Sequence, residues 1–206
     1  MVEYRTDEER VQLILDYFNQ YKLAIISFLL FVIISVSGYF YVTNNNKQLN
    51  SEAYSLYVQW SENKDTALFD KLQGDYINTG FAQLALITRA TLLANEGNID
   101  DSLRLLYLVK ENSDGFFGNS LMNGIARTNI ARISIALGNF EDALKVLEKY
   151  SNDEDAYTHE LKGDALSGIG NDDLALQQYQ SAFEKYTDNG LRNLVQLKIN
   201  NLNTNE

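Results

Sequence analysis

Hydrophobic residues are distributed in two different ways along the chain, and the change falls near residue 43. An uncharged apolar run fills residues 23–42, between Lys22 and Lys47. A helix rises about 1.5 Å per residue, so this run is long enough to cover the roughly 30 Å hydrocarbon core of a bilayer. Beyond it, apolar residues recur every three or four positions, which is typical of amphipathic helices. The pattern predicts an all-α protein, with a single N-terminal transmembrane helix followed by a helical domain.

A cleaved signal peptide is the main alternative for the apolar run, because the run lies near the amino terminus. Its length exceeds the about 7–15 residues of a signal-peptide core. Residues 39–44 also lack the small-x-small pattern that a signal peptidase needs, and aromatic residues flank both ends of the run. We therefore expect an uncleaved anchor with aromatic belts at the headgroups. Small residues within it are candidate contacts with other membrane helices: Ser27, Ser35, Ser37 and Gly38.

Basic residues give the span a direction. Arg5, Arg10 and Lys22 precede it, whereas Lys47 is the single basic residue in positions 43–62. Because basic residues are retained on the cytoplasmic side, the N-terminus is predicted to be cytoplasmic.

The N-terminal tail has helical character of its own. Thr6 and Glu9 match a capping box, and Val11, Ile14 and Phe18 follow at helical spacing. Two interpretations are open: an interfacial helix that lies on the inner leaflet, or a helix that docks on a membrane partner.

Three short strings repeat beyond residue 79. Each begins with a glycine, at Gly97, Gly138 and Gly170, and continues with Asn and acidic residues. Glycine ends a helix in the left-handed conformation at little cost, and Asn caps the next helix. Small residues stand seven positions before and five positions after each glycine: Ala90, Ala131 and Gly163, and Ser102, Ala143 and Ala175. Two helices joined by such a turn, with small residues where they cross, are typical of a tetratricopeptide repeat, so a degenerate helical solenoid is predicted.

The predicted organisation has four parts: a cytoplasmic amphipathic tail at 1–22, the transmembrane helix at 23–43, a linker and leading helices at 44–78, and the repeats with a C-terminal capping helix at 79–206. Helices are expected at 47–63, around Leu68 and Leu72, and at 81–94, 119–137, 156–169 and 190–202. A longer connection is expected at 113–118. Apolar residues of the capping helix should cover the last repeat: Leu191, Leu194, Val195, Leu197 and Ile199.

The composition argues against catalysis and against nucleic-acid binding. The chain has no cysteine, His159 is its only histidine, and its glycines stand singly instead of forming a phosphate-binding loop. We therefore predict no enzyme, no catalytic residue, no metal site and no cofactor. After residue 43, 23 Asp and Glu face 14 Lys and Arg, and such an acidic surface repels phosphate backbones.

Helical repeats offer one functional surface, the concave face lined by the first helix of each repeat. Only Arg132 is cationic among the residues that the register places there, which argues against a clamp for free C-termini. The candidate groove for a peptide or partner consists of Leu84, Ile87, Thr91, Thr128, Arg132, Ile135, Tyr157, Glu160 and Asp164.

Two strings are more specific than the repeat residues: GDAL at 163–166 with Gly170 after it, and KINNL at 198–202. Together with the order of tail, span and acidic repeats, they resemble the YfgM family, the ancillary subunit of the bacterial SecYEG translocon. The resemblance implies an inner-membrane protein with a periplasmic domain and no catalytic residues. It also implies that the protein works beside SecYEG with a PpiD-like periplasmic chaperone and assists polypeptides that emerge from the channel. The alternative is an envelope stress or signalling regulator that acts through its cytoplasmic tail.

Overall fold

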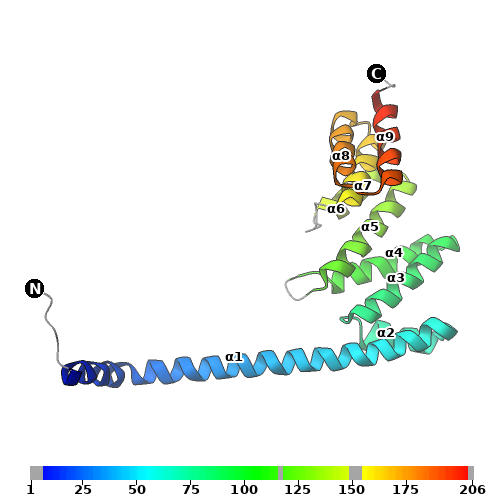
Figure 1. The fold of residues 1–206 in the computed structure, drawn as a ribbon. Coiled ribbons are helices and arrows are strands. Elements are labelled where there is room, and N and C mark those ends of the chain that lie inside the picture. The colour runs from blue at the N-terminus through cyan, green and yellow to red at the C-terminus, as the bar shows by residue number, and fades with distance from the viewer. Residues whose placement is uncertain (1–6, 116–117, 149–154, 204–206) are drawn as a thin grey trace, which may run out of the picture. The chain divides into compact units, whose positions relative to one another are not determined.

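The structure, a computed structural model, describes residues 7–115, 118–148 and 155–203. Every regular element within these ranges is an α-helix (Figure 1). The prediction of an all-α fold is therefore confirmed. The helices are α1 Asp7–Asn63, α2 Thr66–Asp75, α3 Gly80–Asn95, α4 Ile99–Asn112, α5 Ser120–Ala136, α6 Phe140–Glu148, α7 Ala156–Gly168, α8 Asp172–Lys185 and α9 Asn189–Asn203.

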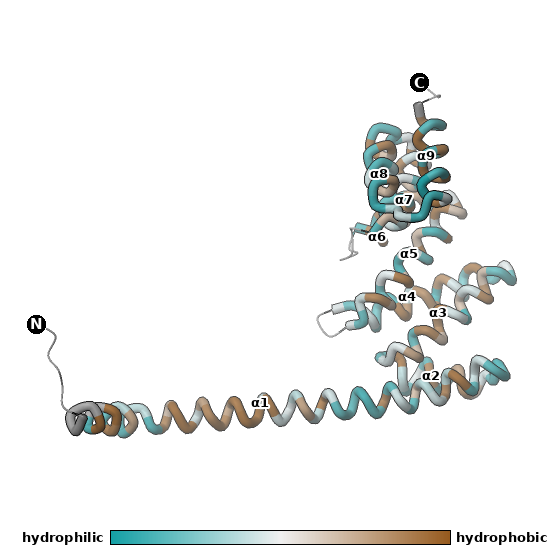
Figure 2. Tube along the Cα trace, in the orientation of Figure 1, coloured by the Kyte–Doolittle hydropathy of each residue, from teal (hydrophilic) through white to brown (hydrophobic). Residues whose placement is uncertain are grey.

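The first helix, α1, is one continuous helix. The sequence pattern indicates three successive elements in this stretch: a tail helix, a span and a leading helix. The chain contains no proline, so nothing in this stretch removes a helical hydrogen bond. Residues 23–42 are exposed along it, and Figure 2 shows them as a hydrophobic band. Among the described residues, α1 is the one helix long and apolar enough to cross a membrane, with a mean hydropathy of 2.4 over its most apolar window. Thr6 of the expected capping box lies outside the described residues.

The chain divides into two units, residues 1–49 and 50–206. In the second unit, each helix from α2 to α9 packs against the next one in sequence. The first helices of successive repeats also touch, since α3 contacts α5 and α5 contacts α7. This nearest-neighbour packing is characteristic of a helical solenoid.

The turns within the repeats have the predicted backbone conformation. Their glycines have φ angles of +82°, +78° and +77°: Gly97, Gly138 and Gly170. A residue with a Cβ atom rarely adopts this region. Asn98 and Asn171 cap α4 and α8, each accepting a hydrogen bond from a backbone N–H of the first helical turn. The predicted Gly-Asn turns are thus confirmed for these two repeats, and Asn139 stands at the same place directly before α6.

Small residues lie where the two helices of each repeat cross, as the register predicts. All six are buried: Ala90, Ala131 and Gly163 in the first helices, and Ser102, Ala143 and Ala175 in the second. Gly163 shows the reason, because a Cβ atom built there would lie 2.5 Å from the ring of Tyr179. Carbon atoms attract each other optimally at about 3.5–4.0 Å, so only glycine permits this approach of α7 to α8.

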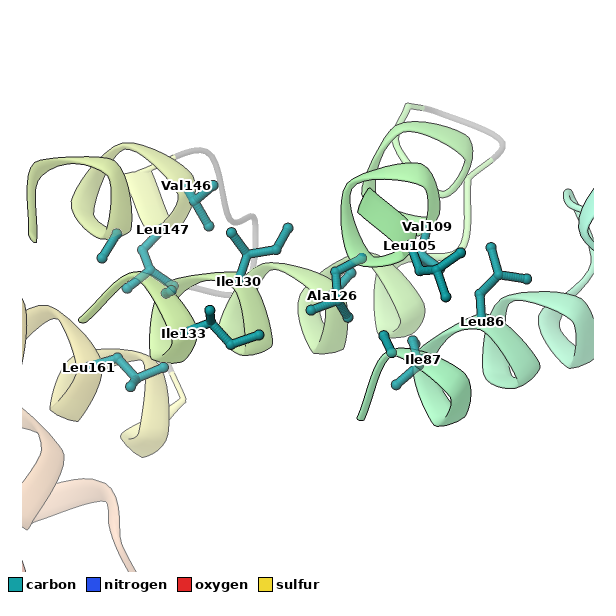
Figure 3. Close-up of a cluster of buried hydrophobic side chains, with 14 of the residues drawn as sticks. Leu86, Ile87, Leu105, Val109, Ala126, Ile130, Ile133, Val146, Leu147 and Leu161 are labelled. Carbon is teal, nitrogen blue, oxygen red and sulfur yellow. The ribbon is translucent and has the colours of Figure 1, made fainter. Parts of the chain in front are cut away.

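The aliphatic core is shared between repeats. Side chains from α3 to α7 form one cluster, in which Ile130 of α5 is completely buried. Figure 3 shows α5 running through this cluster, with Leu105 of α4 near one part of it and Leu147 of α6 near another. A second cluster joins α8 to α9 through Tyr179 and Val195. Side chains from neighbouring repeats therefore share one core, and this packed core holds the surface residues in place.

A buried arginine holds the connections around α5. Arg127 is 3% exposed. Its guanidinium donates to Asn123 Oδ1 at 2.6 Å and to the Val146 carbonyl at 3.0 Å, and it pairs with Asp114 Oδ2 at 3.4 Å. The cation therefore meets α6 near its C-terminal end, where the helix dipole favours positive charge. It also fixes the connection after α4, whose residues 116–117 lie outside the described ranges.

A fourth turn of the same kind precedes the glycine turns, and the sequence analysis missed it. Lys64 has a φ angle of +57° and stands 33 positions before Gly97, close to the repeat length of about 34 residues. Asp65 then caps α2 by accepting the Ala67 N–H at 2.8 Å. We call residues 50–63 of α1 together with α2 the leading pair.

Bulky side chains replace the small crossing residues in the leading pair. Tyr57 stands seven positions before Lys64 and Phe69 five positions after it. The two helices meet through aromatic rings, since the ring centroids of Trp60 in α1 and Phe69 in α2 lie 5.5 Å apart. Both helices also pack on α3 through a cluster that contains Trp60 and Leu72.

Candidate functional site

The candidate groove residues lie on α3, α5 and α7, the first helices of the three repeats. On α3, Thr91 is exposed and Leu84 is half-buried. Ile87 is only 8% exposed and belongs to the shared core. The expectation that Ile87 lines an open groove is therefore wrong, because the aliphatic side chains of the neighbouring helices cover it.

The three candidates on α5 are accessible to different degrees. Arg132 is exposed, and its Nη2 atom donates to Asn129 Oδ1 at 2.9 Å on the same helix. Thr128 is half-buried and donates its hydroxyl to the Gly124 carbonyl at 3.0 Å. Ile135 is half-buried against the core. Arg132 is consequently the member of this helix that is available to a partner.

Arg132 also lies close to the candidates on α7. The pKa of Tyr157 is raised by burial, although the positive charge of Arg132 and a hydrogen bond with Arg132 act to lower it. The structure thus brings together one cation from α5 and one aromatic side chain from α7, which the sequence register had placed on the same face.

The two acidic candidates, Glu160 and Asp164, are bound by a lysine from the capping helix. Lys198 Nζ donates to Glu160 Oε1 at 2.7 Å and to the two carboxylate oxygens of Asp164 at 2.6 and 2.8 Å. Tyr179 donates its hydroxyl to Asp164 Oδ1 at 2.9 Å, and Tyr186 donates to Glu160 Oε2 at 2.7 Å. We call these five residues the polar cluster.

The electrostatics of the polar cluster follow from burial and from these bonds. Burial raises the pKa of Tyr179, and the Asp164 carboxylate raises it further. Burial and the hydrogen bond to Glu160 raise the pKa of Tyr186 in the same way. Burial opposes the charge of Lys198, but its bonds to Asp164 and Glu160 outweigh this, and its pKa is raised. At neutral pH, two protonated tyrosines therefore orient an ion pair.

Sequence reasoning missed Lys198 as a member of this face. Its position is 34 residues after Asp164, one repeat later in the same register, and that spacing was the signal that could have found it. Arg132 is therefore not the only cation near the groove. Lys198 is already engaged by two carboxylates, so it adds no free positive charge for a partner's C-terminus.

The capping helix α9 covers the last repeat with fewer residues than predicted. Val195 and Ile199 are buried against α8, as is Leu202. Leu191, Leu194 and Leu197 are 42%, 55% and 58% exposed, so the prediction for these three is wrong. A helix buries one stripe of its surface, and these three leucines lie outside the buried stripe of α9.

The exposed leucines extend the candidate groove. Leu191 and Leu194 stand 34 positions after Tyr157 and Glu160, in the same repeat register as Lys198 and Asp164. The repeat register therefore extends the face of α7 onto α9, where it adds two apolar positions, Leu191 and Leu194, beside the polar cluster.

The remaining candidates are isolated. Ser27, Ser35, Ser37 and Gly38 are exposed on α1. His159 Nδ1 lies 2.8 Å from Gln178 Oε1, a packing contact between α7 and α8. In the part of the chain that the structure describes, no three His, Cys, Asp or Glu side chains converge as a metal site would require.

Comparison with known proteins supports the repeat assignment. The family described as a tetratricopeptide repeat-like domain matches residues 16–204. No curated protein and no solved structure matches the chain.

Proposed function

Because the chain belongs to the tetratricopeptide repeat-like domain family, we propose that it is a membrane-anchored scaffold that binds a protein partner along the face formed by α3, α5, α7 and α9. Domains of this kind typically bind proteins on an extended concave surface and carry no catalytic groups. The observation that carries the proposal is that each of these four helices has an exposed side chain, Thr91, Arg132, Tyr157 and Leu194, and that Arg132 of α5 interacts with Tyr157 of α7.

We further propose that the partner is the SecYEG translocon together with a PpiD-like periplasmic chaperone, and that the scaffold assists emerging polypeptides. The resemblance to the YfgM family at GDAL 163–166 and KINNL 198–202 supports this proposal. The apolar stretch of α1 supports it as well, since a translocon subunit must reside at the membrane. No catalytic family is indicated, which agrees with a role in binding.

The proposed topology follows from the same residues. The tail at 1–22 would lie in the cytoplasm, the span at 23–43 in the bacterial inner membrane, and the linker with leading helices at 44–78 and the repeats at 79–206 in the periplasm. Ser27, Ser35, Ser37 and Gly38 would then face other membrane helices, because small side chains allow close approach there.

Photo-crosslinking in intact membranes tests the proposal. A photoreactive phenylalanine derivative at position 132 or 157 should capture a chaperone or a SecYEG subunit. The control position is Lys145, which is exposed on α6, the second helix of its repeat. Capture from position 145 alone, or from none of the three positions, would contradict the proposed face.

The tail supports a second candidate function. Val11, Ile14 and Phe18 are exposed on α1, so the amphipathic face expected from the sequence carries accessible apolar side chains. A signalling regulator would use this face to contact a cytoplasmic protein. Replacement of Val11, Ile14 and Phe18 by Ser should then change the envelope stress response while SecYEG association persists, and an unchanged response rejects this function.

A further inference from the structure

A small cavity lies at the turn of the leading pair, away from the candidate groove. Its volume is about 120 Å³, and it is lined by Trp60, Lys64, Thr66, Phe69 and Arg89. These residues come from the end of α1, from α2 and from α3, all within residues 50–206. Phe69, which takes the place of a small crossing residue, is part of this lining.

Arg89 is the group in the cavity that calls for a ligand. It is half-buried, and within the described residues its guanidinium has neither a hydrogen bond nor an ion pair. Its charge acts on Asp101, but that carboxylate is hydrogen-bonded elsewhere: Asn98 donates to Asp101 at 2.8 Å and Arg104 at 3.3 Å. The guanidinium of Arg89 therefore has donors that an anion in the cavity can use.

Lys64 brings a second positive charge to the same cavity. The left-handed backbone at Lys64 replaces the glycine of the other turns, which places a long cationic side chain at this corner. Its Nζ atom donates to the Ser61 carbonyl at 2.8 Å and lies 4.5 Å from the Trp60 ring centroid. No carboxylate in the described chain lies within ion-pair distance of Lys64, so its remaining N–H donors are open to a ligand.

The chemistry of the lining selects the ligand. Arg89 and Lys64 supply donors only, and Thr66 adds a hydroxyl. Asp65 stands next to Lys64, and its carboxylate accepts the Ala67 N–H. Its negative charge offsets one of the two positive charges, so the site suits a monoanion better than a dianion. The planar guanidinium matches a carboxylate in a bidentate manner, and the half-buried ring of Phe69 suits an apolar group that carries it.

We propose that this cavity binds a carboxylate of a protein partner, at a C-terminus or on an acidic side chain next to an apolar group. The carboxylate enters between Arg89 and Lys64, and the apolar group lies against the half-buried Phe69, whose ring is 5.5 Å from that of Trp60. The cavity volume of about 120 Å³ is several times the space of about 10–15 Å³ that one water molecule needs on the same measure, so a carboxylate fits. The chain therefore has a second contact for a partner, separate from the proposed groove.

The single tryptophan makes this proposal directly testable, because Trp60 is the only tryptophan of the chain. The full chain in mild detergent is titrated with N-acetyl-leucine, and the emission of Trp60 is recorded. We expect a saturable change with N-acetyl-leucine and none with N-acetyl-leucinamide, which lacks the carboxylate. Inorganic phosphate should bind at least tenfold more weakly than N-acetyl-leucine.

Variants assign the response to the cavity. Arg89→Gln should weaken N-acetyl-leucine binding at least tenfold, and so should Lys64→Asn, because Asn tolerates the left-handed backbone. Lys71→Gln removes one charge from an exposed site on α2 outside the cavity and should leave binding unchanged. An equal response to the amide, tighter binding of phosphate, absence of any saturable change, or full binding by both Arg89→Gln and Lys64→Asn would each overturn the proposal. None of these outcomes bears on crosslinking from positions 132 and 157.

Discussion

The leading pair and the three glycine-turn repeats share a plan but differ in how their helices meet. Both consist of two helices joined by a left-handed residue and a capping residue, at similar spacing. In the repeats, glycine and small crossing residues allow α3, α5 and α7 to pack closely on α4, α6 and α8. In the leading pair, Lys64, Tyr57 and Phe69 occupy those positions, and the helices meet through the rings of Trp60 and Phe69, 5.5 Å apart. Small side chains at the crossing thus accompany close helix packing, and bulky ones accompany an aromatic contact that borders a small cavity.

The largest expected effect tests the crossing residues. Ala143→Trp places a bulky side chain at a fully buried crossing and should destabilise the domain by about 3 kcal/mol, because overpacking displaces α5 from α6. The matched change in the leading pair, Phe69→Trp, should cost less than about 1.5 kcal/mol. Thermal unfolding followed by circular dichroism measures both. Equal losses would show that the two crossings do not differ as described.

A smaller effect is expected at the other end of the stack, where the polar cluster fastens α9 to α7. Lys198→Met leaves Glu160 and Asp164 without their cation and should lower stability by about 1–2 kcal/mol, since the side chains are partly exposed. The loss should shrink at high salt, because salt screens the remaining repulsion. Lys185→Met, at an exposed site on α8, is the control. A loss for Lys198→Met no greater than for Lys185→Met would mean that the cluster does not hold α9.

The smallest effect concerns the turn residues and has opposite signs in the two regions. Gly97→Ala introduces a Cβ atom at a φ angle of +82° and should destabilise the domain by about 1 kcal/mol. Lys64→Gly relieves the same strain in the leading pair and, after the entropy cost of a glycine is subtracted, should stabilise it by about 0.5–1 kcal/mol. Melting temperatures of both variants provide the measurement, and a stability loss for Lys64→Gly would contradict the equivalence of the two turns.

Sequence reasoning succeeded where the signal is local and failed where it is not. The turns at Gly97 and Gly170 could be predicted because glycine and the following Asn satisfy the backbone within a few residues. The turn at Lys64 could not be predicted in the same way because its left-handed residue is a lysine and not a glycine, although Asp65 and the spacing to Gly97 indicate a turn there. The polar cluster was not predicted because Lys198 and Asp164 stand a whole repeat apart in the sequence.

The faces of helices were predicted less well than their bounds. Ile87 was expected on the open face but lies in the shared core, and Leu194 was expected to cover the last repeat but lies exposed. A helical period identifies an apolar stripe, yet it does not state which edge of a wide stripe the next helix covers. That choice depends on the packing of α9 against α7 and α8, which a single sequence does not display.

The most direct test of the proposed scaffold is recovery of its partner from mild-detergent membranes. The full chain is purified as wild type, as Arg132→Glu with Leu194→Asp, and as Lys145→Glu, and co-purifying proteins are quantified by mass spectrometry. Wild type and Lys145→Glu should recover the same chaperone or translocon subunits, and the double variant should lose at least tenfold of them at an unchanged melting temperature. Equal recovery by the double variant and wild type would contradict binding along the face of α5 and α9.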